Sequence, residues 1–151
     1  MNILSPFLSG DDIALLRRLC CSTHGEDKHE KVGRIGRPDK LHILPWLAAR
    51  IQAQIHVAVG RVDDHMQIYR IRGAVPLHVD EDFPGEGGMV ARYSVLLRLN
   101  DDYEGGETRI AWETVDIPVG GGIIFPHDLP HEGLAVRAGA KLMVKTDLFV
   151  H

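Results

Sequence analysis

A histidine and an aspartate one residue apart, His78 and Asp80, are followed far along the chain by a further histidine, His131. Imidazole nitrogens and a carboxylate are ligands that one divalent first-row metal accepts together. When two imidazoles and one carboxylate bind on one side of the ion, the other side stays open for exogenous ligands, as in non-heme Fe(II) sites that use O2. These three residues therefore predict a metal centre for oxygen chemistry.

A His-x-acid triplet has little specificity by itself, because His24 and Glu26 form another one in this chain. His78 and Asp80 are favoured by their setting at the end of a strand-forming run. There, positions i and i+2 project to the same side and can both reach one ion. His24 lies in a polar segment that offers no such platform.

The third ligand must come from a distant strand, and His127 and His131 are the candidates. His127 directly follows a proline in a loop, whereas His131 begins the next strand-forming run. This difference favours His131. The alternative, that both histidines are surface loop residues, stays open at the level of sequence.

A metal held from one side by three ligands has room for a 2-oxo acid, bound through its carboxylate and keto oxygens, and for O2. The far carboxylate of such an acid needs a buried cation. Lys141 is well placed for this, at the start of a strand just past Gly139. Tyr69, on the strand before His78, could donate its phenol to the same carboxylate. The alternatives are a solvated surface lysine and a half-buried core tyrosine.

Alternation along the strand from Arg92 to Leu99 places Arg92, Ser94, Leu96 and Arg98 on one face. An inward Arg98 would be costly unless it met an anion. Either Arg98 binds a cosubstrate or substrate carboxylate, or this face is in contact with solvent. Arg92 is a second candidate for a substrate carboxylate.

The N-terminal part predicts two helices. Ser9 is a good helix cap, with acids in the first turn and an apolar spacing that ends near Cys21. Pro45 suits the first turn of a second helix, whose apolar stripe consists of Trp46, Leu47, Ile51 and Ile55. Residues 22–40, between the two, have no apolar period and predict an irregular segment that could be mobile.

From Met66 onward, short strand-forming runs are separated by glycine or proline, which predicts a barrel or a sandwich of about eight strands. Residues 82–88, rich in glycine, predict either a loop that covers the site or a long turn. The expected strands are Met66–Arg72, Val75–Asp80, Ala91–Leu99, Glu107–Trp112, Val115–Ile117, Gly122–Pro126, His131–Arg137 and Lys141–Val150.

The order of these motifs resembles the prolyl-4-hydroxylase-like branch of the Fe(II)/2-oxoglutarate-dependent dioxygenases over residues 66–150. The match combines weak motifs into a specific set, and one departure is Arg98, where relatives often have tyrosine. The matching positions are Tyr69, Gly73, His78-Val-Asp80, Leu99 to Thr108, Gly122 to Phe125, His131-Glu-Gly, Val136 and Gly139-Ala-Lys141.

The resemblance implies a mainly β fold, a double-stranded β-helix (a jelly-roll or cupin-like barrel) with about two supporting N-terminal helices. It also implies that the cofactors are Fe(II), the cosubstrate 2-oxoglutarate and O2. His78, Asp80 and His131 would be the iron ligands, Lys141 would bind the distal carboxylate of 2-oxoglutarate, and Tyr69 would assist it. Because halogenating relatives lack the carboxylate, Asp80 implies hydroxylation.

Length and composition fit one domain, with 151 residues of which 44% are hydrophobic. Residues 1–65 would be a helical support region and residues 66–151 the catalytic barrel. The net charge of -4 comes from interspersed acids and bases, which disfavours nucleic acid as a partner. We expect no membrane contact, and a cytoplasmic protein with reduced cysteines, because Cys20 and Cys21 are neighbours.

The leading hypothesis is an enzyme that hydroxylates an unactivated C–H bond of a free amino acid or other small metabolite, releasing succinate and CO2. One alternative is a hydroxylase of peptidyl proline or another protein side chain. Two others are a catalytically silent sensor that binds metal or oxo acid, and a cupin-like metalloenzyme that uses no oxo acid. The sequence gives neither the substrate nor the oligomeric state.

Overall fold

A computed structural model describes residues 1–22, 41–55 and 60–151 of the chain. Its helices are α1 (Gly10–Ser22), α2 (Pro45–Gln54) and the short 3-10 helix η1 (Glu86–Gly88). Its strands are β1 (Asn2–Leu4), β2 (Leu41–Ile43), β3 (Arg61–Val62), β4 (His65–Ile71), β5 (Val75–His78), β6 (Phe83–Pro84), β7 (Val90–Arg98), β8 (Glu104–Gly105), β9 (Thr108–Ile110), β10 (Glu113–Val115), β11 (Gly122–Pro126), β12 (His131–Gly133), β13 (Val136–Ala138) and β14 (Lys141–Val150).

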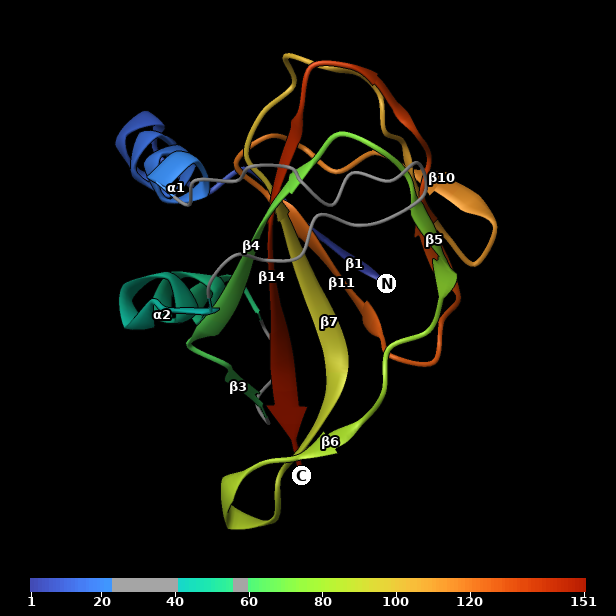
Figure 1. Cartoon of the computed structure of the whole chain (residues 1–151). Helices are drawn as coiled ribbons and strands as arrows, with labels where there is room; N and C mark the ends of the chain where they lie inside the picture. The colour runs from blue at the N-terminus through green and yellow to red at the C-terminus, as the bar shows by residue number, and fades with distance from the viewer. Residues whose placement is uncertain (23–40, 56–59) are drawn as a thin grey trace.

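The described strands form a large sheet, a smaller sheet and a two-stranded ribbon. The large sheet has the order β1-β11-β7-β14-β4-β2, with β3 beside β14 and β6 beside β7. The smaller sheet has the order β10-β9-β12-β5, and β13 pairs with β8. In Figure 1, α1 and α2 lie on one side of the large sheet and the smaller sheet lies on the other. This arrangement agrees with the mainly β, jelly-roll architecture that the resemblance implies.

Strict alternation along β7 and β14 gives the large sheet two different faces. On the helical side, Leu97 and Val144 belong to an apolar core that includes Leu16, Leu47 and Ile51 of the helices. The opposite face, which includes Ile123 and Phe125 of β11, packs with Ile110 of β9 in a second apolar cluster. The polar side chains of the site lie on this second face.

Helix α1 begins as the sequence predicts. The backbone N–H of Asp12 donates to Ser9 Oγ at 3.1 Å, and the N–H of Ser9 donates to Asp12 Oδ2 at 2.9 Å, which is a reciprocal cap. Helix α2 begins at Pro45, as predicted, and buries Leu47 and Ile51 of the predicted stripe together with Ala48. Trp46 and Ile55 are partly buried against the same core, and Ile55 lies just past the end of the helix. The expectation for residues 22–40 falls almost entirely outside the described residues.

Replacing Ser9 by alanine is expected to lower the free energy of unfolding by about 1 kcal/mol, because an N-terminal donor loses its side-chain acceptor. Urea denaturation followed by circular dichroism measures the effect. Ser5→Ala is a matched control, since Ser5 is exposed and precedes the helix. Equal stabilities of the two variants would contradict the capping role.

The strand predictions are confirmed at Gly122–Pro126 and Lys141–Val150, whose bounds the structure reproduces. The predicted run His131–Arg137 is divided, because β12 pairs with β5 and β9 whereas β13 pairs with β8. The prediction of a strand at Val115–Ile117 is wrong. Ala111 and Trp112, with φ of 49° and 66°, form a two-residue turn that pairs β9 with β10, so the strand begins two residues before the predicted position. No glycine marks this turn in the sequence.

Residues 82–88 form a turn beside the start of β7, in agreement with the second of the two interpretations of this segment. β6 pairs with β7, and the chain then reverses through η1, where Gly87 and Gly88 have φ of 64° and 76°. This turn is the lowest part of the molecule in Figure 1.

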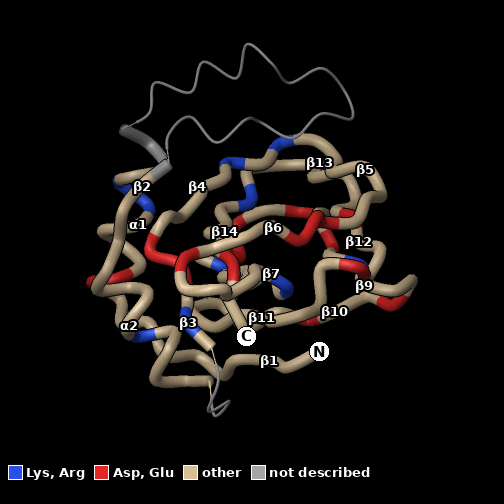
Figure 2. Tube along the Cα trace, turned by 90° about the horizontal axis from the view of Figure 1, so that it is seen from below, with Lys and Arg blue, Asp and Glu red and all other residues tan. Residues whose placement is uncertain are grey.

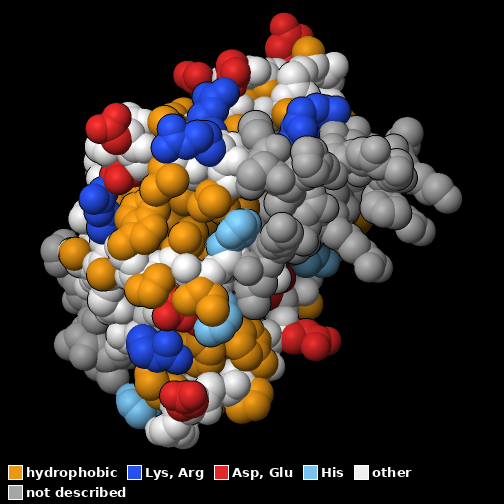
Figure 3. Space-filling model, turned by 60° about the vertical axis from the view of Figure 1, so that its left-hand side comes forward, with side chains coloured by type: hydrophobic (Ala, Val, Ile, Leu, Met, Phe, Trp, Pro, Cys, Tyr) orange, Lys and Arg blue, Asp and Glu red, His pale blue; other side chains and the backbone are white. Residues whose placement is uncertain are grey.

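Acidic and basic residues are scattered over the described trace (Figure 2). On the face drawn in Figure 3, charged side chains of both signs surround a band of hydrophobic side chains that is interrupted by histidines. Among the described residues, no helix is both long and apolar enough to cross a lipid bilayer.

Candidate metal centre

His78 and His131 are brought together by strand pairing. β12 lies between β9 and β5, and in the register of β12 with β5 His131 is directly opposite His78. The two ring centroids are 4.2 Å apart. Asp80 lies just beyond the end of β5, where its backbone N–H donates to the carbonyl of His127 at 2.9 Å. The predicted pair and its distant partner therefore meet at one end of the smaller sheet.

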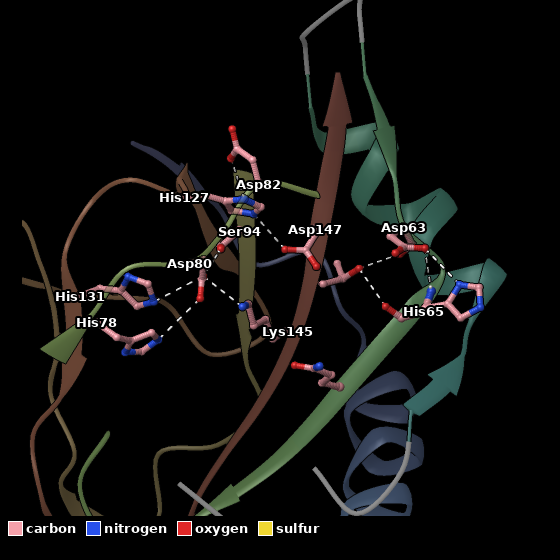
Figure 4. A network of polar contacts seen from close by, with 12 residues as sticks. Asp63, His65, His78, Asp80, Asp82, Ser94, His127, His131, Lys145 and Asp147 are labelled. Atoms are coloured by element: carbon pink, nitrogen blue, oxygen red, sulfur yellow. Dashed lines mark hydrogen bonds and ion pairs between the residues drawn. The ribbon is translucent and has the colours of Figure 1, made fainter. Parts of the chain in front are cut away.

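The three side chains converge as a metal site requires (Figure 4). His78 Nε2 is 3.6 Å from Asp80 Oδ1, and His131 Nε2 is 3.5 Å from Asp80 Oδ2. One ligand atom from each of the three residues lies within 4.8 Å of the others. Ligands about 2.0–2.2 Å from one ion and at right angles are separated by roughly 3 Å, so small adjustments bring all three to one metal.

The other ring nitrogens show which atoms face the ion. His78 Nδ1 is 2.8 Å from the carbonyl of Pro76, and His131 Nδ1 is 2.9 Å from the carbonyl of Leu129. A carbonyl only accepts, so each Nδ1 carries a proton, and the corresponding neutral tautomer presents an Nε2 lone pair toward Asp80. Burial lowers the pKa of His131 and favours its neutral form. Lone pairs and a carboxylate that face one another fit a divalent cation between them.

Asp80 is held as an anion. Burial by itself would raise the pKa of Asp80, but the hydrogen bond from Ser94 and the charge of Lys145 lower it below its usual value. Ser94 Oγ donates to Asp80 Oδ2 at 2.5 Å, and Lys145 Nζ is 3.0 Å from the same oxygen. The carboxylate is thus charged and oriented as a metal ligand needs.

A cavity of about 190 Å³ extends from these residues into the barrel, and Lys141 lines it together with them. Lys141 is buried, and its Nζ donates to the carbonyl of Gly106 at 2.5 Å and to Thr108 Oγ1 at 2.8 Å. Burial, with help from the charge of Arg98, lowers the pKa of Lys141 to about 8. Both hydrogen-bond acceptors are neutral, so the ammonium fits an anionic group in the cavity.

Lys141 is not a surface residue as the alternative in the sequence analysis had it. It shares one face of β14 with Met143 and Lys145, and all three line the cavity. Lys141 therefore lines the same cavity as Asp80. Its ammonium is bonded to Gly106 and Thr108 and not to Asp80, as the 2-oxo acid hypothesis requires.

Tyr69 also lines the cavity, from β4, where it is the strand partner of Met143. Burial, and then the negative charges of Asp80 and Asp147, raise the pKa of Tyr69 to about 12, so the phenol stays protonated. In the structure its O–H donates to Gln67 Oε1 at 2.5 Å. The hydroxyl is therefore a donor close to the cavity, and its role toward a cosubstrate stays a prediction.

The two arginines lie outside this cavity. Arg98 is half-buried at the end of β7, where it donates to the carbonyls of Asn100 and Ile117 and stands 3.7 Å from Asp116. The sequence analysis expected an inward guanidinium to need an anion, and Arg98 has two backbone carbonyls and the exposed carboxylate of Asp116 as partners. Arg92 is exposed and pairs with Asp82 at 2.9 Å. Arg98 nevertheless lines an adjoining hollow of about 320 Å³ together with Lys141, Gly106 and Thr108, so its role toward a cosubstrate stays a prediction.

His127, the rival third ligand, is buried on the other side of Asp80. Its Nδ1 is 3.1 Å from Asp82 Oδ1 and its Nε2 is 3.1 Å from Asp147 Oδ1 (Figure 4). Both ring nitrogens are thus occupied by carboxylates, whereas His131 directs one nitrogen to the cluster. The interpretation of both histidines as surface residues is wrong, since each is buried. His24 lies outside the described residues.

A further group with metal-ligating side chains consists of Asp63, Asp64 and His65. These residues lie at the turn into β4, and they are partly or fully exposed. Exposed acids of this kind are common without an ion. The group shares no residue with the cavity of Lys141, so the candidate centre is the one at His78.

Two residues that contact the centre were missed in the sequence analysis, Ser94 and Lys145. Alternation places Ser94 on the same strand face as Arg92 and Leu96, but the sequence pattern assigns it no role. Lys145 follows Lys141 by four positions on a predicted strand, which puts both on one face. The same periodicity could have found it.

Comparison with solved structures places this arrangement of sheets among oxygenases. A viral collagen prolyl hydroxylase from Paramecium Bursaria Chlorella virus-1, solved as a 2OG complex, matches with a TM-score of 0.71 and 17% identity, over 99% of this chain and 96% of that chain. A prolyl-4-hydroxylase from Pseudomonas putida matches with a TM-score of 0.65 and 18% identity, over 99% of this chain and 92% of that chain.

An oxidoreductase of the 2OG-Fe(II) oxygenase family from Burkholderia pseudomallei matches with a TM-score of 0.51 and 16% identity, over 69% of this chain and 51% of that chain. No family model and no curated protein matches the sequence. The chain therefore has the double-stranded β-helix fold of the 2OG-Fe(II) oxygenases, as it is found in the prolyl hydroxylases.

Proposed function

We propose that the protein is an Fe(II)- and 2-oxoglutarate-dependent dioxygenase that hydroxylates an unactivated C–H bond. One observation carries the proposal. The Nε2 atoms of His78 and His131 and the carboxylate of Asp80 converge at the same cavity that holds the buried ammonium of Lys141. A metal-ligand set and an anion-binding cation in one cavity are what a metal-chelating oxo acid with a second carboxylate requires.

The metal ligands and the residues around Lys141 have separate proposed roles. His78, Asp80 and His131 hold the iron from one side and leave its other side to exogenous ligands. Lys141 and Thr108 bind and orient the distal carboxylate of 2-oxoglutarate. The bound iron, with 2-oxoglutarate and O2, supplies the oxidation, in which one oxygen atom enters succinate, the other enters the product and CO2 is released.

The cavity walls control access to the metal. Ile71, Leu96 and Met143 contribute apolar surface to the cavity that the metal ligands and Lys141 also line. These side chains exclude water from the space beside the metal, which protects a reactive oxidant and strengthens the attraction between Lys141 and a carboxylate. Tyr69 adds a hydroxyl donor to the same wall.

The substrate is proposed to be a free amino acid or another small metabolite. Next to the cavity is a polar hollow of about 310 Å³ that shares Asp80 and Lys145 with it. Its lining also includes Asp63, Gln67 and Asp147, which suit a small molecule with amine and hydroxyl groups. A peptide is the second candidate, since two of the similar structures are prolyl hydroxylases by name.

Two measurements test the proposal. Succinate formation from 2-oxoglutarate in the presence of Fe(II) and O2 tests the enzyme class, and no turnover with any substrate would favour a silent binding module. Mass spectrometry after incubation with amino acids and with proline-containing peptides tests the substrate. A gain of one oxygen only in peptides would overturn the small-molecule proposal.

The affinity for 2-oxoglutarate is expected to depend on pH through Lys141. Because the pKa of Lys141 is lowered to about 8, its positive charge is present below that pH and is lost above it. Binding should therefore weaken as the pH rises from 8, by up to about tenfold per pH unit. Calorimetric titration of the Mn(II)-loaded protein under argon measures it.

Lys141→Arg is the control for this pH dependence, because a guanidinium keeps its charge over the whole range. The variant should bind 2-oxoglutarate with an affinity that changes little between pH 7 and 9.5. An equally steep loss in both proteins would assign the effect to another group.

A further inference from the structure

Lys145 contacts the candidate metal centre, and the proposed function assigns it no role. It lies on β14, and its Nζ stands 3.0 Å from Asp80 Oδ2 (Figure 4). The side chain is only 21% exposed, and it lines both the cavity and the polar hollow. The ammonium is thus beside the carboxylate that is proposed to bind the metal, at the boundary of the two spaces.

The two oxygens of Asp80 have different surroundings. Oδ2 accepts the hydrogen bond from Ser94 Oγ and faces the ammonium of Lys145. Oδ1 faces His78 Nε2 at 3.6 Å, and His131 Nε2 lies 3.5 Å from Oδ2. Two donors from neighbouring strands, β7 and β14, therefore hold Oδ2, whereas Oδ1 is directed toward His78.

This asymmetry matters for a metal with open positions. A carboxylate can bind a metal through one or both of its oxygens. If Asp80 used both, it would occupy a position that a chelating oxo acid or O2 needs. The positive charge of Lys145 also repels a cation and withdraws part of the charge of Asp80 from it.

We propose that Lys145 is a positioning residue, which keeps Asp80 bound to the metal through one oxygen and limits the affinity of the site for the metal. This inference rests on the proposed function. Ser94 is its neutral partner on the same oxygen, and Lys145 supplies the charge. Lys145 thus lowers the affinity of the site for the metal and keeps a coordination position open for the cosubstrate.

The test compares Lys145→Met with Lys145→Arg at constant neutral pH, in the full chain. Mn(II) affinity is measured by calorimetry and by the electron paramagnetic resonance signal of free Mn(II). The affinity of the Mn(II)-loaded protein for 2-oxoglutarate is measured under argon. Lys145→Gln, which keeps a donor without the charge, separates the two contributions and carries the test if the methionine variant does not fold.

The expected changes have opposite signs. Lys145→Met should bind Mn(II) about tenfold more tightly, within the range by which outer partners of a ligand alter metal affinity. It should bind 2-oxoglutarate more weakly, because Asp80 can now use both oxygens and a cation has left the cavity. Lys145→Arg should restore both affinities toward the wild type.

The other results overturn the inference. Weaker binding of both Mn(II) and 2-oxoglutarate would indicate a merely structural lysine, and unchanged affinities would indicate a bystander. These results are distinct from failure of the proposed function, in which the wild-type protein itself would bind neither Mn(II) nor 2-oxoglutarate.

Discussion

Replacing Asp80 by asparagine is expected to abolish succinate formation and to weaken Mn(II) binding by more than about 100-fold. Changes in the outer partners of metal ligands alone cost about 10- to 100-fold in affinity. Loss of a charged ligand should cost more. Asparagine keeps the shape of the side chain and an oxygen acceptor for Ser94, but it has no negative charge. Calorimetry with Mn(II) and an assay of succinate give the two values.

Asp116→Asn is the control for this change. The Asp116 side chain is 98% exposed and lies 3.7 Å from Arg98, outside the cavity. The same chemical substitution should leave Mn(II) affinity and turnover at wild-type values. An Asp80→Asn protein that still bound Mn(II) normally would remove Asp80 from the ligand set.

Replacing Lys141 by methionine is expected to raise the KM for 2-oxoglutarate by about 100-fold while Mn(II) affinity stays near the wild-type value. Truncating one partner of a buried charge pair costs about 2–5 kcal/mol, and about 1.4 kcal/mol corresponds to a tenfold change. Methionine fills a similar volume, and the metal ligands lie elsewhere in the cavity. Initial rates over a range of 2-oxoglutarate concentrations measure the change.

The same variant should be at least as stable as the wild type in the absence of ligands. Lys141 is buried, and its acceptors are a carbonyl and a hydroxyl, so methionine removes the cost of burying a charge. A raised KM together with an unchanged or higher melting temperature separates binding from folding. If activity were intact in Lys141→Met, the cupin-like alternative without an oxo acid would be favoured.

The sequence predicted those parts of the fold that depend on local patterns. Alternation placed Ser94 and Arg98 on the face of β7 that is directed away from the helices, and a serine cap and a proline marked the starts of α1 and α2. It failed where pairing is non-local. β1, with three residues at the edge of the large sheet, has no pattern that announces its pairing with β11.

The candidate site was predictable to a similar degree. His78, Asp80, His131 and Lys141 could be found because each lies on, or next to, a strand with a readable register. The contacts of Arg98 could not be predicted, because its acceptors are the backbone carbonyls of Asn100 and Ile117, and a sequence does not show where carbonyls point. Contacts of this kind become visible only in three dimensions.

The central claim is that His78, Asp80 and His131 bind one metal ion from one side. A crystal soaked with Mn(II) and measured for anomalous scattering tests it directly. The account predicts a single strong peak within bonding distance of both Nε2 atoms and of an oxygen of Asp80. A peak at Asp63, Asp64 and His65 instead, or none between the two imidazoles, would contradict it.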